Sequence, residues 1–128
     1  MARILAVAEH RNGKLSEATL EMCKAAKALA SALGAEPAAA VMSKDDTIAK
    51  EVAKYIPLVF SVTAPELEVY NSDGYAQAIK AIVDSQDVKG VLIPHSYDGV
   101  DYAAKVAMAI DAGIVSNCSW KRYRHLSP

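Results

Sequence analysis

The stretch GVLIPHSYDGVDYAAKVAMAIDAGIVSN, residues Gly90–Asn117, carries the clearest structural pattern in this chain. It predicts, in order, a buried strand at Val91–Ile93, a polar loop at Pro94–Gly99, a helix over about Val100–Ala112 and, after Gly113, a strand at Ile114–Val115. A strand, a helix and a second parallel strand form a right-handed βαβ unit. The stretch therefore indicates a parallel sheet with helices packed on it.

Apolar spacing and charge divide the predicted helix of this stretch into two faces. Its apolar positions recur three and four residues apart, and we expect these to be buried: Ala103, Val106, Ala107 and Ile110. Asp101 and Lys105 are expected on the solvent face, where their spacing predicts an i,i+4 ion pair.

The beginning of the chain predicts another strand and helix. Arg3–Ala8 is a continuous apolar run, which is typical of a strand covered on both faces. Asn12-Gly13 marks a turn, and Ser16 is expected to cap a helix over Glu17–Leu33. Gly34 follows where a glycine commonly ends a helix.

The middle of the chain repeats this alternation. Pro37 opens an expected strand at Ala38–Met42, and Pro57 opens another at Leu58–Val62. Between them we expect a short helix that is capped by Asp45 or Asp46 and carries Ile48, Val52 and Tyr55.

The second of these strands is followed by an expected loop at Thr63–Asn71, with a brief extended piece at Leu67–Tyr70. A helix capped by Ser72 or Asp73 comes next, and its expected apolar face consists of Tyr75, Ala78, Ile79, Ile82 and Val83.

Together these elements predict an α/β fold: a doubly wound, mainly parallel sheet with helices on both faces, Rossmann-like and adenine-nucleotide-hydrolase-like. Residues 1–117 are expected to form one nucleotide-fold domain, and residues 118–128 a C-terminal tail or truncated strand. The chain has 128 residues, of which 52% are hydrophobic and 23% charged, and this composition argues against disorder.

Charge and hydropathy exclude several classes of partner. The formal net charge is −1, so no overall positive field attracts nucleic acid or an acidic membrane. No apolar run is long enough to cross a bilayer. The two cysteines, Cys23 and Cys118, form no CxxC pair and are interpreted as reduced thiols of a cytoplasmic protein.

Ligands of such sheets lie at the carboxyl ends of the strands, near the point where the strand order reverses. This rule selects two loops, Glu9–Lys14 and Pro94–Gly99, and makes these residues the candidates for cofactor binding: His10, His95, Ser96 and Gly99. Phosphate binding is disfavoured there. Neither a GxGxxG motif nor a P-loop is present, and Asp98 and Asp101 are expected to satisfy the N–H groups at the helix start and to repel a phosphate.

The sequence predicts no catalytic or metal site. Cys23 lies on the apolar face of a helix, and Cys118 has no identifiable third group to orient a nucleophile. His10 and His95 lack the further ligands of a stable metal site. The basic and aromatic residues of 120–125 are interpreted as a frayed tail or isolated strand rather than as a nucleic-acid site.

Two motif blocks carry a family resemblance. The first is ILAVAEHRNGKLSEATL, Ile4–Leu20, with a strand that ends in Ala-Glu-His and then a Gly-Lys-Leu-Ser turn. The second is Val91–Asn117, with its alanine-rich helix and Gly-Ile-Val-Ser-Asn ending. In order and spacing the chain resembles the N-terminal domain of the electron transfer flavoprotein α subunit. It departs from the family pattern at Val100 and Lys105, where arginine is usual, and at Asn117, where aspartate is usual.

The resemblance implies a part of an electron carrier without a catalytic site of its own. In that family the α subunit continues into further strands and a separate domain that holds FAD, so FAD is not expected on this chain alone. The implied role is a scaffold that binds the β subunit. Two alternatives stay open: a small adenine-nucleotide-binding domain that holds AMP or ATP, and a structural subunit that self-associates, since an uncovered sheet edge tends to pair.

Overall fold

Four parallel strands form the central sheet, in the spatial order β5-β4-β1-β6. Their bounds are Arg3–Val7 for β1, Glu36–Ser43 for β4, Val59–Thr63 for β5 and Val88–Leu92 for β6. The structure is a computed structural model that describes residues 2–94 and 96–110. The predicted α/β fold with a mainly parallel sheet is confirmed.

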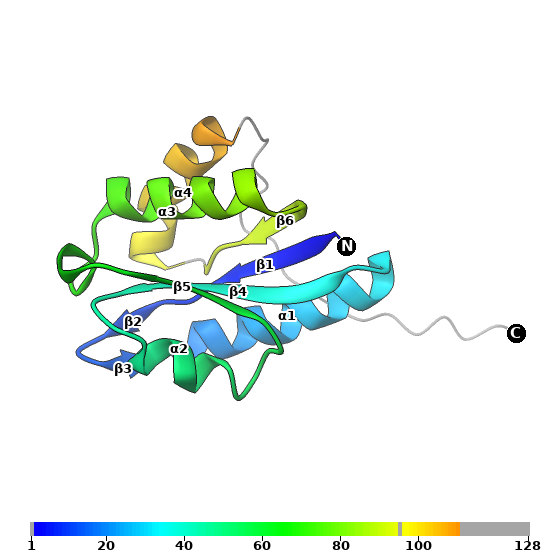
Figure 1. Cartoon of the computed structure of the whole chain (residues 1–128), viewed down its shortest axis with the longest axis horizontal. Helices are drawn as coiled ribbons and strands as arrows, with labels where there is room; N and C mark the ends of the chain where they lie inside the picture. Colours follow the sequence, from blue (N-terminus) through cyan, green and yellow to red (C-terminus); the bar gives the residue numbers. More distant parts are fainter. Residues whose placement is uncertain (1, 95, 111–128) are drawn as a thin grey trace, which may run out of the picture.

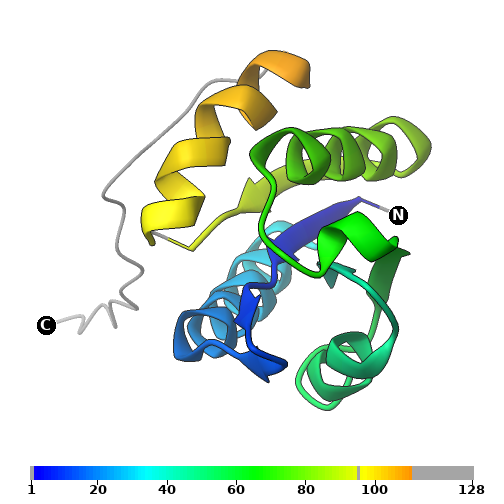
Figure 2. The ribbon, with the colours of Figure 1, turned by 90° about the vertical axis from the view of Figure 1, so that its left-hand side faces the viewer.

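Helices cover both faces of the sheet. α1 (Glu17–Leu33) and α2 (Thr47–Val52) pack on one face, and α3 (Ser72–Ser85) and α4 (Tyr97–Ala109) on the other. The two helical layers lie above and below the sheet in Figure 1 and Figure 2. No helix within the described residues is long and apolar enough to cross a membrane.

The side chains of β1 alternate between two hydrophobic cores. Leu5 and Val7 pack with residues of α3 and α4, whereas Ile4 and Ala6 pack with residues of α1 and α2. All four side chains are at most 1% exposed. Because both faces are covered, the strand needs apolar residues at every position, which explains its unbroken apolar run.

The predicted first helix is confirmed at both ends. α1 covers Glu17–Leu33, and the Ser16 side chain accepts a hydrogen bond from the Thr19 N–H. Gly34 ends the helix in the left-handed region, at φ 67°, where a side chain would be strained.

A small hairpin, which the sequence pattern did not predict, follows β1. β2 (His10–Arg11) and β3 (Lys14–Leu15) pair antiparallel around the predicted Asn12-Gly13 turn. Both turn residues have positive φ, 53° and 73°, as a type I′ turn requires. Strands of two residues are too short to show the alternation that identifies a strand in sequence.

Two expectations for the middle of the chain were wrong. Tyr55 is exposed rather than part of an apolar helix face, because α2 ends at Val52. Pro65–Leu67 forms the 3₁₀ helix η1, which replaces the extended piece expected at Leu67–Tyr70. Leu67 is buried in the core beside α3, and this packing favours a compact turn over an extended segment.

The predicted caps were partly wrong. Asp46 stands at the N-cap of α2 without a side-chain cap bond, while Asp45 accepts a hydrogen bond from the Thr47 N–H at 3.0 Å. α3 is capped by Asn71, whose side chain accepts from the Gly74 N–H, and not by Ser72 or Asp73. Helix boundaries shifted by one residue are common when several residues near the start can cap.

The last helix begins earlier than predicted, at Tyr97 instead of Val100. Its most buried residues are Tyr102 and Val106, whereas Ala103, Ala107 and Ile110 are half-buried. Several expectations lie outside the described residues: the helix end at Gly113, the strand Ile114–Val115, Cys118, the tail 120–125 and the boundary at residue 117.

Candidate functional site

The loops after β1 and β6 lie side by side at the carboxyl ends of their strands, as predicted. β4 and β5 extend the sheet on one side of β1, and β6 pairs with its other side, so the strand order reverses between β1 and β6. The Ser96 hydroxyl donates a hydrogen bond to the Glu9 carboxylate, 2.8 Å from Oε2 and closer still to Oε1. This contact joins two loops that are 87 residues apart in sequence.

The backbone of Glu9 is fixed by the first turn of α1. The Glu9 N–H donates to Thr19 Oγ1 at 2.7 Å, and the Thr19 hydroxyl donates back to the Glu9 carbonyl at 3.1 Å. Thr19 is 1% exposed, so water does not compete for these bonds. Neither residue was among the predicted site residues, although Glu9 could have been found as the first polar side chain after a buried strand.

Ser96 and Gly99, two of the predicted ligand residues, form the start of α4. Ser96 Oγ accepts a hydrogen bond from the Gly99 N–H at 3.0 Å while its proton is directed to Glu9. A Cβ at Gly99 would lie 2.0 Å from the Pro94 carbonyl oxygen. The glycine is therefore required by close backbone packing, and both residues have a structural role in this geometry.

Asp98 and Asp101 are not the cap of α4, contrary to the prediction, because Ser96 provides it. The Asp101 carboxylate accepts the Tyr70 hydroxyl at 2.6 Å, and Asp98 lies 3.7 Å from the Arg11 guanidinium. The expected Asp101–Lys105 pair is also wrong. Lys105 reaches across to α3 instead, where its ammonium lies 2.9 Å from Asp73. The expected concentration of negative charge at this helix start is nevertheless present.

Three tyrosines pack behind the loops. The ring centroids of Tyr70, Tyr75 and Tyr102 are 5.2–5.8 Å apart, with edge-to-face or tilted geometry that aromatic pairs prefer. Tyr102 is fully buried, and its hydroxyl has no hydrogen-bond partner within the described residues. Tyr75 and Tyr102 are part of the hydrophobic core on this face of the sheet, and Tyr70 packs against it.

This environment shifts the acid–base properties of the site. Burial raises the pKa of the Glu9 carboxyl, the Ser96 hydrogen bond lowers it, and the Asp98 and Arg11 charges act in opposite directions. Burial, together with the charges of Glu9 and Asp98, raises the pKa of Tyr75 to about 12. The same causes raise the pKa of Tyr102. At neutral pH both tyrosines therefore keep their phenol proton.

The histidine pair is only partly described. His10 Nε2 donates to the Met42 carbonyl at 2.7 Å, a bond that ties the hairpin to the end of β4. His95 lies outside the described residues. Over residues 2–94 and 96–110, no group of three His, Cys, Asp or Glu side chains is arranged to hold a metal ion. Cys23 is buried, and this burial raises the pKa of its thiol, which fits its predicted place in the core.

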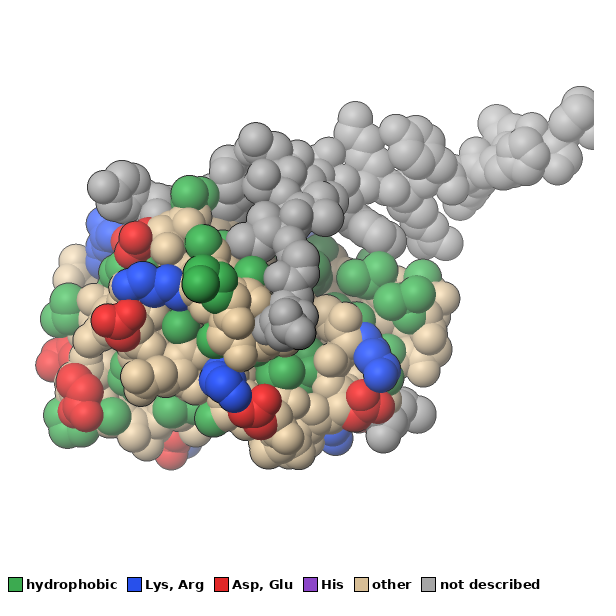
Figure 3. All heavy atoms as spheres, turned by 90° about the horizontal axis from the view of Figure 1, so that it is seen from above, with side chains coloured by type: hydrophobic (Ala, Val, Ile, Leu, Met, Phe, Trp, Pro, Cys, Tyr) green, Lys and Arg blue, Asp and Glu red, His purple; other side chains and the backbone are tan. Residues whose placement is uncertain are grey.

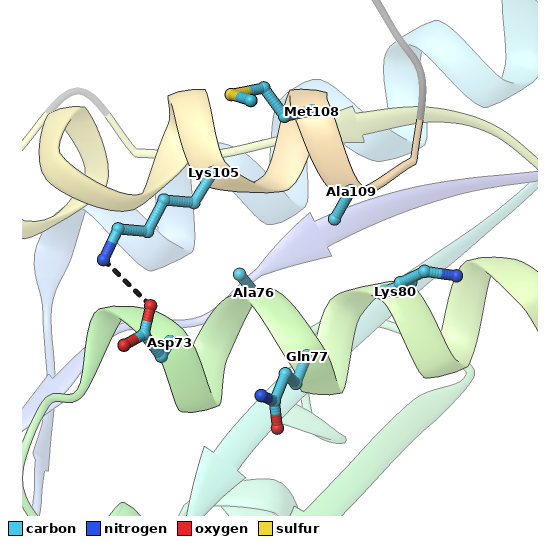
Figure 4. Close-up of a pocket in the computed structure, with 7 residues that line it drawn as sticks. All are labelled: Asp73, Ala76, Gln77, Lys80, Lys105, Met108 and Ala109. Carbon is cyan, nitrogen blue, oxygen red and sulfur yellow. Dashed lines mark hydrogen bonds and ion pairs between the residues drawn. The ribbon is translucent and has the colours of Figure 1, made fainter.

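A shallow groove lies between α3 and α4 (Figure 4). Its volume is about 460 Å³. Figure 4 shows Ala76 and Ala109 pointing toward each other between the helices, with the Asp73–Lys105 ion pair at one end and Lys80 at the other. No local sequence pattern predicts this groove, because it depends on how two helices pack against each other.

Comparisons with known proteins agree on one family. Residues 4–123 match the family model described as "Electron transfer flavoprotein domain". The chain is similar to the electron transfer flavoprotein subunit alpha of Syntrophomonas wolfei, with 30% identity over 85% of this chain and 34% of the relative. The subunit alpha of Megasphaera elsdenii is 29% identical, over 91% of this chain and 35% of the relative. That of Bacillus subtilis is 25% identical, over 90% and 35%. The chain spans about a third of the length of the curated relatives it matches.

Proposed function

The chain belongs to the electron transfer flavoprotein domain family, and from this membership we propose that it serves as the N-terminal domain of an α-type subunit in an electron carrier. Its role there is that of a scaffold that binds a β-type subunit, without a catalytic site of its own. The match over residues 4–123 to a single family model is the observation that carries this proposal.

The geometry at the point where the strand order reverses, between β1 and β6, supports a scaffold role. The carboxylate of Glu9 is engaged by Ser96, and the N-terminus of α4 is capped by the same hydroxyl. Groups that could otherwise contact a ligand are thus used to hold β1 and α4 together. Hydrogen bonds of this kind rigidify a domain that presents its surface to a partner.

The residues described at this helix start do not fit the diphosphate of FAD. A phosphate prefers the uncovered N–H groups of a helix N-terminus and nearby positive charge. Here the N-terminus is capped, and Glu9, Asp98 and Asp101 outnumber the single arginine, Arg11. We therefore propose that the full-length relatives bind their flavin outside the third of their length that aligns with this chain.

A visible absorption spectrum and an analysis of co-purifying proteins test the proposal. Protein isolated from its native host is expected to bring a β-type subunit with it, and the isolated chain to show no flavin absorbance. Stoichiometric, tightly bound FAD on the chain alone would contradict the placement of the flavin. Isolation without any partner would contradict the scaffold role.

A second candidate function is adenine-nucleotide binding over the loops 9–14 and 94–99. It is supported by one observation, the adjacency of these loops at the point where the strand order reverses. Titration with AMP and ATP tests it. If the chain has this function, binding of AMP or ATP should saturate and should be lost on substitution of His95 or Gly99. Titration heats equal to the heat of dilution of the nucleotide would exclude it.

We further propose that residues 1–117 act as one domain and that the protein works in the cytoplasm. The small net charge of −1 fits a protein that binds neither nucleic acid nor acidic membranes. Limited proteolysis tests the boundary, because cleavage near residue 117 should leave a folded fragment.

A further inference from the structure

An asparagine followed by a glycine forms the tip of the β2–β3 hairpin. Asn12 and Gly13 are the two central residues of its turn, with φ 53° and 73°. Both are exposed, and a Cβ placed on Gly13 would have no heavy atom from elsewhere in the described residues within 4 Å. The tip projects beyond the carboxyl end of β1 (Figure 1). Solvent therefore reaches the Asn12–Gly13 peptide bond.

The reacting groups of this dipeptide are not engaged elsewhere. Among residues 2–94 and 96–110, neither the Asn12 side chain nor the Gly13 N–H has a hydrogen-bond partner; the side-chain hydrogen bond of the hairpin is made by His10. Asparagine is among the chemically labile residues of proteins, because a main-chain nitrogen can attack its side-chain amide. Glycine is the residue that best permits this attack from the following position, since it has no Cβ to hinder the approach.

The turn can rearrange without unfolding of the domain. The hairpin is held at its base, where His10 Nε2 donates to the Met42 carbonyl at 2.7 Å. Its strands have two residues each, and a ribbon this short is marginally stable by itself. A type II′ turn requires positive φ only at its first central residue, so rotation of the Asn12–Gly13 peptide plane exchanges the two turn types and leaves Asn12 at positive φ. The rotation reorients the Gly13 nitrogen toward the Asn12 side chain at low cost, because glycine accepts both signs of φ.

Asn71 provides a contrast within the same chain. It is exposed as well, but its side-chain oxygen accepts the Gly74 N–H at 2.9 Å and caps α3. Ser72 follows it, and the side chain of this serine hinders an attack by its main-chain nitrogen. Both features slow a reaction at Asn71, and neither is present at Asn12.

Charges of one sign flank the turn. Arg11 and Lys14 lie on either side of Asn12-Gly13, and both are exposed. Over the α3–α4 face, in contrast, side chains of both signs are interspersed with hydrophobic ones (Figure 3). The Arg11 guanidinium lies 3.7 Å from the Asp98 carboxylate at the start of α4. A change of charge at Asn12 therefore acts on an ion pair of the candidate site.

We propose that Asn12 is a site of spontaneous deamidation, which converts the turn from neutral to acidic. The Gly13 nitrogen forms a bond to Asn12 Cγ, and its proton leaves with the side-chain amide group as ammonia. The five-membered succinimide that results takes up one water molecule and opens to aspartate or to isoaspartate. Water is the only co-reactant, and the reaction does not depend on the proposed electron-carrier role.

The two products have different effects on the hairpin. Aspartate is ionised at neutral pH and is accepted in a type I′ turn, so it adds a charge and keeps the backbone. It competes with Asp98 for Arg11, but Arg11 is 82% exposed and the free energy of unfolding should change little. Isoaspartate carries the main chain through the side-chain carbons and lengthens it by one atom, so it should open the two-residue turn.

Peptide mapping by mass spectrometry tests the site in the whole, folded chain during incubation in a mildly alkaline buffer. Asn12 should convert at least about tenfold faster than Asn71, because Asn71 has first to release its cap bond. Ion-exchange chromatography should show an acidic form that appears at the rate measured for Asn12.

Two matched variants assign this acidic form. Asn12→Asp removes the reactive amide and keeps a residue that the turn accepts, so the form should no longer appear at the wild-type rate. Asn71→Asp removes the other amide and keeps a residue that caps helices well, so the form should appear as in the wild type. Circular dichroism should show that both variants are folded.

Three outcomes would overturn the proposal. They are an intact Asn12 in the folded chain after a period in which the urea-unfolded chain converts it, a folded chain in which Asn71 converts as fast as Asn12, and an acidic form that appears at an undiminished rate in Asn12→Asp. The spectrum and co-purification experiment would be unaffected by any of them, so this proposal and the proposed function can fail separately.

Discussion

Ser96 at the start of α4 donates a hydrogen bond to the carboxylate of Glu9, in the loop that follows β1, with 2.8 Å between Oγ and Oε2. The same serine caps α4 through the Gly99 N–H. One hydroxyl therefore orients a helix and joins it to the central strand.

Ser96→Ala should lower the free energy of unfolding by about 2–4 kcal/mol, because it removes both a helix cap and a hydrogen bond to a charged group. Ser16→Ala is the matched control, since Ser16 caps α1 without contacting a carboxylate. It should cost about 1 kcal/mol. Urea denaturation measures both values, and equal losses would mean that the Glu9 contact adds nothing to stability.

The stability of the Glu9→Gln variant relative to the wild type should increase as the pH rises. Burial raises the pKa of Glu9 in the folded state, so folding favours the protonated carboxyl. The stability that Glu9 contributes is then fully present below its unfolded-state pKa and is lost as the pH rises through its folded-state pKa. Glutamine stays neutral and does not undergo this loss.

The difference in unfolding free energy between Glu9→Gln and wild type should therefore grow from acidic to neutral pH and then level off. Urea denaturation at several pH values measures it. Glu17→Gln, at an exposed position in the first turn of α1, serves as the control for removal of a surface carboxylate. A difference that is constant with pH, or that shrinks as the pH rises, would contradict the prediction.

Gly99→Ala should destabilise the protein by about 2–4 kcal/mol, even though alanine favours helices, because the new Cβ would meet a backbone oxygen at 2.0 Å. The Pro94 carbonyl belongs to the main chain and cannot move aside as a flexible side chain could. Gly90→Ala is the control, because its Cβ would come no closer than 3.5 Å to Ile4. Thermal unfolding should separate the two variants clearly, and a similar melting temperature for both would show that α4 can shift.

Tyr102→Phe should be neutral or should stabilise the protein by about 1 kcal/mol, because it removes a buried hydroxyl that has no partner within the described residues. Tyr70→Phe should have the opposite effect, a loss of about 1 kcal/mol, since it removes the 2.6 Å bond to Asp101. Chemical denaturation compares them. A marked loss of stability in Tyr102→Phe would show that its hydroxyl is satisfied, for example by an ordered water.

Local patterns were sufficient for the framework of the fold. The apolar runs placed four strands, and Ser16 and Gly34 fixed the ends of α1, because capping and glycine conformation act over a few neighbouring residues. The adjacency of the loops after β1 and β6 also followed from the sequence, through a rule about parallel sheets. The family was recognisable from two motif blocks, and residues 4–123 match its model.

Interactions across the fold determined the rest. The pattern around residue 100 suggested an Asp101–Lys105 pair along one helix, yet Asp101 bonds to Tyr70 and Lys105 to Asp73. An exposed pair on one helix contributes only a few tenths of a kcal/mol, so contacts with neighbouring elements easily replace it.

The candidate site likewise divides into features set by local sequence and features set by tertiary packing. Spacing in the sequence sets which residues lie on a strand, a helix or a loop, since these choices depend on near neighbours. Only the packing of α4 into the core beside α3 brings Ser96 to Glu9, buries the Tyr102 hydroxyl and forms the groove beside Met108. Such contacts join residues far apart in the chain, and their energies depend on burial that no local pattern records.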